Sequence, residues 1–220
     1  MRPYLPKLSD EHQEIVVLDS DSDDDWRADY WHTDATFDAA PPRASILQME
    51  VCPAAGGDTL WSNQYVAYES LSEPVRELLS GLSAVHVASH TTGRSAEHPA
   101  VRRHPETGRQ TLFVNRASTS HFVQLRPGES NALLNYLYEF SEQPRFQCRY
   151  RWSAGTVAVW DNRCTQHYAI VDFDGPRVIH RVTVLGDVPE GEPPRWPAIE
   201  ADRGEQRRAQ SARAQRQRTR

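Results

Sequence analysis

The sequence predicts a mainly β fold with flanking helices, arranged as an antiparallel double-stranded β-helix, or jelly roll. Short runs of β-branched and aromatic residues recur along the chain between turn-forming stretches. The residues with the strongest chemical signal, His32, Asp34 and His167, stand far apart in sequence. An antiparallel double sheet brings distant strand ends of this kind together, so both observations favour the same architecture.

Strands are predicted at residues 14–19, 45–51, 146–152 and 156–160. The first two are rich in apolar β-branched residues, which suit a pleated and partly buried surface. Residues 146–152 alternate in polarity like a strand with one face buried. Residues 156–160 form a continuous apolar run, which is typical of a strand buried on both faces.

Helices are predicted at residues 63–79 and 130–140, where apolar residues recur at helical spacing. Pro74 lies inside the first of these and is expected to begin a second helical segment, because proline cannot donate a backbone hydrogen bond. The apolar residues of the second helix are predicted to belong to the core.

Composition points to one globular domain flanked by polar ends. The 220 residues are 38% hydrophobic, carry a net charge of −5 and include three cysteines without a Cys-x-x-Cys pair. These features favour neither nucleic acid nor anionic membranes, and they indicate no disulfide framework or zinc site. We expect a polar N-terminal segment over 1–28, a catalytic domain over 29–189 and a disordered Pro- then Arg-rich tail over 190–220. With no visible signal peptide or membrane span, the default expectation is a cytoplasmic protein.

The His-x-Asp pair and the distant histidine form a candidate metal site. His32 and Asp34 would point to the same side of an extended strand, because side chains alternate along a strand. Adding His167 gives two histidines and one carboxylate, a ligand set typical of non-haem Fe(II) oxygenases. Arg181 follows fourteen residues later and could hold an acidic co-substrate, since a guanidinium binds carboxylates bidentately.

Several blocks in this order resemble the TauD/TfdA (taurine dioxygenase) family of Fe(II)/2-oxoglutarate-dependent dioxygenases. The resemblance runs from about Asp29 to Asp187 and is carried by residues 31–34 (WHTD), 56–61 (GGDTLW), 104–115, 160–169 (WDNRCTQHYA) and 179–187.

The resemblance implies a role for each matching residue. His32, Asp34 and His167 would bind iron and act in catalysis, and Thr59 would bind 2-oxoglutarate together with Arg177 and Arg181. We expect the substrate to contact Ala35, Arg181 and Phe122. The implied reaction uses Fe(II), O2 and 2-oxoglutarate, releases succinate and CO2, and hydroxylates a small organic anion. Alkylsulfonates such as taurine, alkyl sulfate esters and aryloxyalkanoates are the candidate substrates.

Two alternatives remain open. Members of the family carry a substantial segment before the His-x-Asp pair, whereas His32 arrives early here, so we expect a jelly roll that is incomplete at its N-terminus. The chain could then be a truncated, non-catalytic homologue that still binds metal or 2-oxoglutarate. The arginines of the tail suggest nucleic-acid binding, but no aromatic residues interleave with them, and we expect neither a nucleic-acid nor a membrane partner. Homo-oligomerisation is left open.

Overall fold

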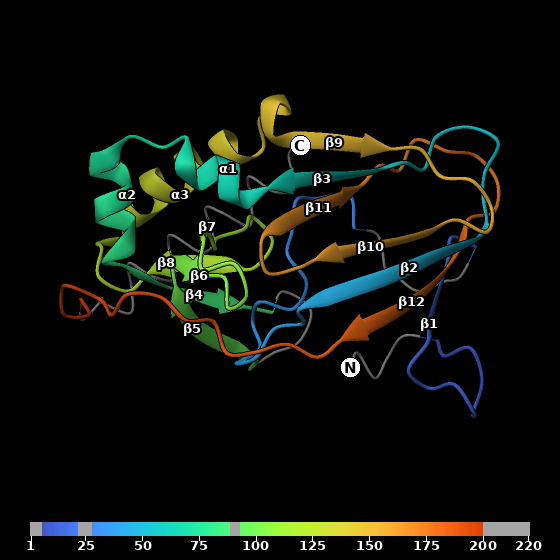
Figure 1. Ribbon diagram of the computed structural model, residues 1–220, viewed down its shortest axis with the longest axis horizontal. Helices are drawn as coiled ribbons and strands as arrows, with labels where there is room; N and C mark the ends of the chain where they lie inside the picture. The colour runs from blue at the N-terminus through green and yellow to red at the C-terminus, as the bar shows by residue number, and fades with distance from the viewer. Residues whose placement is uncertain (1–5, 22–27, 89–92, 200–220) are drawn as a thin grey trace.

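The structure, a computed structural model, describes residues 6–21, 28–88 and 93–199. Figure 1 shows two antiparallel sheets at one end of the molecule and a group of helices and short strands at the other. The larger sheet has the order β1-β12-β2-β10, and the smaller one has the order β11-β3-β9. The strands are β1 (Val16–Asp19), β2 (Ala44–Val51), β3 (Thr59–Asn63), β9 (Gln147–Tyr150), β10 (Val157–Asp161), β11 (Thr165–Ala169) and β12 (Val178–Val184).

The two sheets share one apolar interior, as a jelly roll requires. Leu47 and Met49 of β2 and Ile179 of β12 are buried in a cluster with Trp152 and Trp160, and Trp61 of β3 packs against them. Residues 28–32 run beside β11, because the amide of Ala169 donates to the carbonyl of Ala28 at 3.0 Å. Residues 28–32 therefore lie beside β11 as a fourth segment of the smaller sheet, and His32 stands at the end of this segment.

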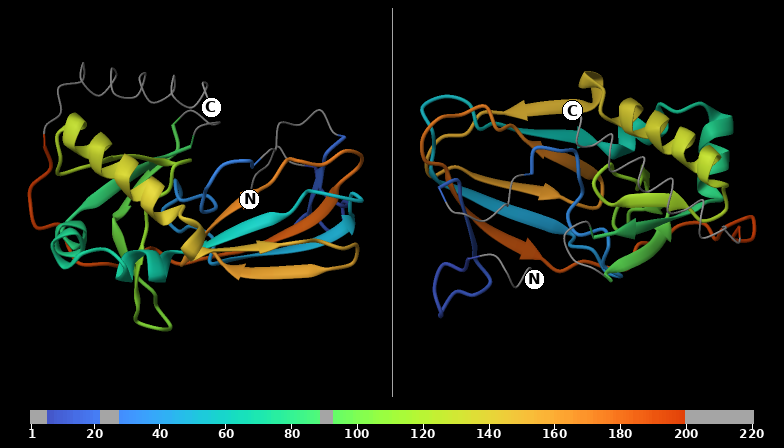
Figure 2. Two further views of the ribbon diagram at one scale, coloured as in Figure 1. Left: turned by 90° about the horizontal axis from the view of Figure 1, so that it is seen from above. Right: turned by 180° about the vertical axis from the view of Figure 1, so that it is seen from behind.

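A long insertion between β3 and β9 forms the helical end, which Figure 2 shows from two further directions. Its elements are α1 (Gln64–Glu69), α2 (Glu73–Ser80), β4 (Ser83–Val87), β5 (Ser95–Pro99), β6 (Val101–Arg103), β7 (Gln110–Leu112), β8 (Thr119–Phe122), α3 (Pro127–Ser141) and the short 3-10 helix Pro144–Phe146. A second hydrophobic cluster fills this part, with Leu79, Phe122, Leu134 and Leu137 among its buried members.

The predicted helices are present, and the first is divided near the proline as expected. Asn63 caps α1 by accepting hydrogen bonds from the amides of Tyr65 and Val66, and Pro74 lies in the first turn of α2. The second helix is longer than predicted because Glu129 accepts a hydrogen bond from the Arg126 amide at 2.9 Å and stabilises an earlier start.

Two local predictions were wrong. β10 is not buried on both faces: Val157 and Val159 are 55% and 65% exposed, since they lie on the outer face of the larger sheet. His32 and Asp34 do not share a regular strand. His32 forms an isolated bridge with His167, and the chain turns from Asp34 onward.

The C-terminal segment differs in part from the predicted disordered tail. Within residues 190–199, the Arg195 amide donates to the carbonyl of Gly81 and the Ile199 amide donates to the carbonyl of Val123, both at 3.0 Å. These residues therefore pack against the helical end. The arginine-rich remainder, residues 200–220, lies outside the described ranges. Among the described residues, no helix has the length and apolar character needed to cross a membrane.

Candidate active site

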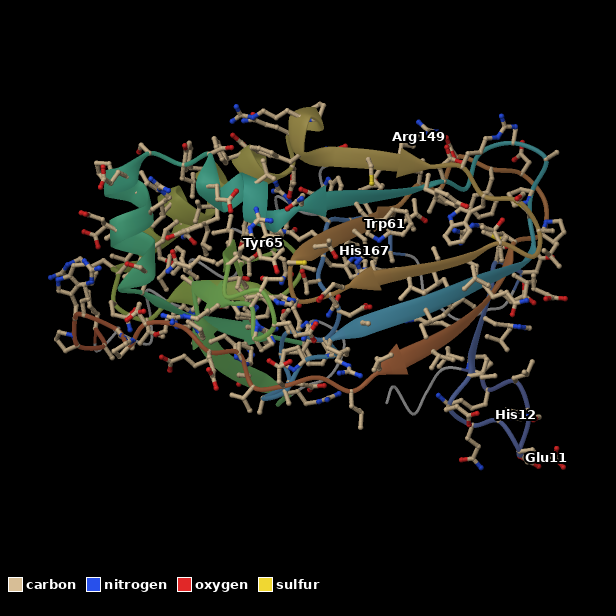
Figure 3. The ribbon with its side chains drawn as sticks, in the orientation of Figure 1. Glu11, His12, Trp61, Tyr65, Arg149 and His167 are labelled. Atoms are coloured by element: carbon tan, nitrogen blue, oxygen red, sulfur yellow. The ribbon has the colours of Figure 1, made fainter. Side chains whose placement is uncertain are left out.

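Three ligand atoms converge between the two sheets of the jelly roll. His32 Nε2 and His167 Nε2 lie 3.8 Å and 3.9 Å from Asp34 Oδ1, and all three residues are buried. The two histidines exchange both backbone hydrogen bonds, at 3.0 Å and 2.8 Å. This reciprocal pairing explains how residues so distant in sequence hold their imidazoles side by side. Figure 3 shows His167 next to Trp61, its partner in the pairing of β11 with β3.

The surroundings prepare these atoms for a metal. His32 Nδ1 lies 2.9 Å from the carbonyl of Tyr30, so Nδ1–H donates there and Nε2 keeps its lone pair. Ser45 Oγ and Arg181 Nη2 donate to Asp34 Oδ2 at 2.8 Å and 2.5 Å. The other oxygen, Oδ1, is the one that faces both histidines. Two imidazole nitrogens and one carboxylate oxygen in this arrangement fit Fe(II) with open coordination positions.

The backbone of Asp34 is held as firmly as its side chain. The side chain of Asn162 accepts from the Asp34 amide at 3.0 Å and donates to the Asp34 carbonyl at 3.2 Å. The next residue, Ala35, has a φ of 48°, which is unusual for a residue with a side chain. A sharp, tightly held turn therefore directs the Asp34 carboxylate.

A second set of polar residues lies at the start of β3. Thr59 Oγ1 accepts a hydrogen bond from the indole of Trp152 at 2.9 Å, which leaves the hydroxyl proton to be donated elsewhere. Arg177 is only 2% exposed, and its Nη2 donates to the carbonyl of Gly57 at 3.1 Å. A Cβ on Gly57 would lie 3.1 Å from Arg177 Nε, so glycine gives the guanidinium room. Burial lowers the pKa of Arg177 to about 10, yet it stays cationic at neutral pH.

Unpaired buried hydrogen-bond donors are a feature of the interior between the sheets. Within the described residues, four buried donor atoms lack a partner there: Trp61 Nε1, Trp160 Nε1, Arg177 Nε and Arg181 Nε. Unpaired buried donors are costly unless a ligand or water satisfies them. With two guanidinium groups and the carboxylate of Asp34, this interior suits an anionic ligand that has several acceptor oxygens.

The structure brings most, but not all, of the expected site residues together. Ala35 directly follows the candidate ligand Asp34, and Arg181 Nη2 donates to Asp34 Oδ2. Phe122 does not join them: it is fully buried in the cluster of the helical end, where it packs with core leucines. An aromatic residue in a short strand has the same local sequence pattern whether it lies in the core or lines a pocket. Only the tertiary packing shows which of the two places it occupies.

Sequence reasoning missed three residues that support the site: Ser45, Trp152 and Asn162. Asn162 belongs to the block of residues 160–169 that also contains Trp160 and His167, so its place in that block was a signal that it supports the site. Ser45 begins a predicted strand and gave none, because its importance comes from a contact with Asp34 across the fold.

Another group, His104, Asp161 and Cys164, also places metal-ligating atoms close together. Its chemistry is that of an ion-pair network. His104 Nε2 and Arg163 Nη2 lie 2.9 Å and 2.7 Å from Asp161 Oδ2. These bonds outweigh the effect of burial and hold the pKa of Asp161 at about 2. Burial raises the pKa of Cys164 to about 11, so its thiol stays protonated.

Comparison with known proteins identifies the class. Residues 2–183 match the family described as "Taurine catabolism dioxygenase TauD, TfdA family". The chain belongs to this family, and the predicted resemblance is confirmed.

Individual relatives agree with this assignment. A crystal structure of a taurine dioxygenase from Burkholderia xenovorans superposes with a TM-score of 0.78 at 42% identity, covering 87% of this chain and 72% of that one. The predicted jelly roll is thereby confirmed. The chain is 40% identical over 202 residues to an alpha-ketoglutarate-dependent sulfate ester dioxygenase of Pseudomonas putida, covering 80% of this chain and 65% of that protein. It is 36% identical over 198 residues to an alkylsulfatase of Acinetobacter baylyi, covering 80% of this chain and 62% of that protein. The chain thus spans less than two thirds of the length of these two relatives.

Proposed function

We propose that this protein is an Fe(II)- and 2-oxoglutarate-dependent dioxygenase that hydroxylates a small organic anion. The observation that carries the proposal is the pairing of a buried His-Asp-His ligand set with an interior rich in unpaired donors. Alpha-ketoglutarate is another name for 2-oxoglutarate, and relatives named for dependence on it support the same co-substrate here.

The two arginines would divide the work of binding anions. Arg177 lies beside Gly57, two residues from Thr59, so this pair suits the carboxylate of 2-oxoglutarate that is remote from the metal. Arg181 lies against Asp34 and suits an anionic group close to the metal, either the near end of the co-substrate or the substrate. Arg177 directly precedes β12 and Arg181 lies within it, so one segment of the chain supplies both guanidinium groups.

Bound Fe(II) would supply the oxidative chemistry, in which 2-oxoglutarate and O2 give succinate and CO2 while the substrate is hydroxylated. His32, Asp34 and His167 would hold the ion on one side. Ser45 and Arg181 would keep Asp34 Oδ2 occupied, so that Oδ1 is presented to the ion. The buried walls around Trp61 and Trp160 would limit access of water to the reacting groups.

For the substrate, we infer a sulfate ester, a sulfonate or an aryloxyalkanoate. Relatives named for these three classes support the range. Ala35 would line the pocket beside the metal, where its small side chain leaves room, and Arg181 would contact the substrate's anionic group. Phe122 is not part of this proposal.

The first test is an anaerobic titration of the protein with Fe(II) and 2-oxoglutarate. We expect the visible metal-to-ligand charge-transfer band of the ternary complex, and we expect His32→Ala and Asp34→Ala to lose it. A band from the wild type would be followed by measuring succinate released with each of the three substrate classes. Folded protein without the band would refute the proposal.

The alternative is a non-catalytic homologue that retains metal or 2-oxoglutarate binding. A charge-transfer band without succinate formation for any tested substrate would favour it.

A further inference from the structure

The structure assigns Asn162 a positioning role, in which its carboxamide fixes the Asp34 peptide so that the carboxylate faces both histidines. The inference rests on the proposed metal site and adds a residue that acts on it through Asp34.

The contacts of Asn162 converge on one short turn. Its side chain is buried, at 1% exposure. Oδ1 accepts from the Asp34 amide at 3.0 Å, and Nδ2 donates to the carbonyls of Asp34 and Pro42 at 3.2 Å and 2.9 Å. The Asn162 amide donates to the carbonyl of Arg43 at 2.8 Å. One side chain is thus hydrogen-bonded to the peptide groups on both sides of the Asp34 Cα.

These bonds matter because they hold the peptide of the metal-ligand candidate itself, whereas the other backbone hydrogen bonds of the turn are made by the carbonyls of Ala35, Thr36 and Asp38. Residues 34–37 form a turn, outside any regular strand. Ala35 adopts a φ of 48°, a conformation that is unfavourable for a residue with a side chain and persists only where the surroundings enforce it. If the Asp34 peptide rotated, Oδ1 would leave the position that it shares with the two imidazoles.

Asn162 also couples the two segments that supply ligands. It stands in the turn between β10 and β11, five residues before His167, whereas Asp34 belongs to the other segment. A second bond joins the same segments, from Thr33 Oγ1 to the carbonyl of Thr165 at 3.1 Å. The carboxamide is therefore a direct link between the His167 segment and the carboxylate ligand.

Gln124 provides a matched control. It is a buried side-chain amide that accepts from the backbone amide of Ser83 at 2.9 Å and donates to Ser83 Oγ at 2.8 Å. It belongs to the helical end and touches no ligand residue. Replacing Asn162 with alanine removes three side-chain hydrogen bonds and replacing Gln124 removes two. A purely structural role therefore predicts losses of stability of similar size and no difference in metal binding.

The experiment measures thermal unfolding of the metal-free proteins and Co(II) affinity by its visible d–d absorption. We expect Asn162→Ala to raise the Co(II) Kd about 10–100-fold, as is typical when a partner of a metal ligand is lost. Gln124→Ala should change this Kd less than about threefold, and Asn162→Asp, which keeps the acceptor but loses both donors, should also weaken binding.

Each outcome decides the inference. An Asn162→Ala protein that folds and binds Co(II) within threefold of wild type overturns it and leaves the proposed function intact. A wild-type protein that binds neither Co(II) nor Fe(II) refutes both. Should both Asn162 variants fail to fold, hydrogen exchange in the metal-free wild type decides. We expect the Asp34 amide, which donates to Asn162 Oδ1, to exchange at least about 100-fold more slowly than that of the exposed loop residue Asp174 when corrected for intrinsic rates, and comparable rates refute the inference.

Discussion

Replacing Arg177 with methionine should weaken the binding of 2-oxoglutarate but leave the free energy of unfolding unchanged or higher. Arg177 is buried, has one hydrogen bond to the Gly57 carbonyl at 3.1 Å, and has an Nε without a partner among the described residues. Burial of this charge therefore costs stability in the free protein, which nearby Asp58 offsets only in part, and a bound anion would offset it further. Methionine keeps much of the apolar volume and removes the charge.

The expected magnitudes follow from these contacts. Losing one partner of a buried charge pair costs about 2–5 kcal/mol, which corresponds to a rise in the 2-oxoglutarate Kd of roughly 30-fold to 4,000-fold. Burial lowers the pKa of Arg177 to about 10, equivalent to about 3 kcal/mol against its charged form. After loss of the bond to Gly57, we expect the free energy of unfolding to rise by about 0–2 kcal/mol, or up to roughly 6 °C in Tm.

The assay is an anaerobic titration of 2-oxoglutarate into the Fe(II)-loaded protein, paired with thermal unfolding of the metal-free protein. Arg102→Met is the matched control, because Arg102 is equally buried but pairs with Asp187 at 2.5 Å. That variant should lose some stability and keep its 2-oxoglutarate Kd within about threefold. An Arg177→Met protein that folds and keeps the wild-type Kd would show that the reasoning about this guanidinium is wrong.

Further predictions concern the metal, a tight turn and acid stability. His32→Ala should lose Fe(II) binding in equilibrium dialysis while staying folded, since it removes one of three ligands; wild-type affinity would exclude His32 as a ligand. Gly56→Ala should cost about 2–4 kcal/mol in denaturant unfolding, because φ is 75° and the added Cβ would lie 2.4 Å from the Asp172 carbonyl oxygen; Gly155→Ala, at φ 80° with open space around it, should cost only about 1–2 kcal/mol, and equal costs would contradict the clash. Burial lowers the pKa of His98, whose Nε2–H donates to the Thr36 and Asp38 carbonyls. Below about pH 6.5 the unfolded chain therefore binds more protons at His98 than the folded protein does. The contribution of His98 to stability is present above that pH and is lost as the pH falls below it. His98→Gln should flatten the stability change between pH 7.5 and 5.5, measured by denaturant unfolding, and an unchanged slope would assign that change to other groups.

The local pattern of the sequence was sufficient for the helices, for four of the strands (β1, β2, β9 and β10) and for the type of chemistry. Apolar spacing placed the helices that became α1, α2 and α3, since that spacing reflects one buried face. The same information misjudged β10, because an apolar run has the same appearance whether both faces are covered or one is exposed. Phe122 was misplaced for a related reason: its type and neighbours fit a pocket wall as well as a core.

By itself, the sequence determined which groups could bind a metal and an anion, since the identities of His32, Asp34, His167 and the two arginines are fixed by composition and order. Only the tertiary structure decided which Asp34 oxygen faces the histidines and which residues hold it there. Those choices depend on contacts between segments more than a hundred residues apart, such as Asn162 with the Asp34 peptide. A local pattern carries no record of such contacts, because their free energy arises when the sheets close around the site.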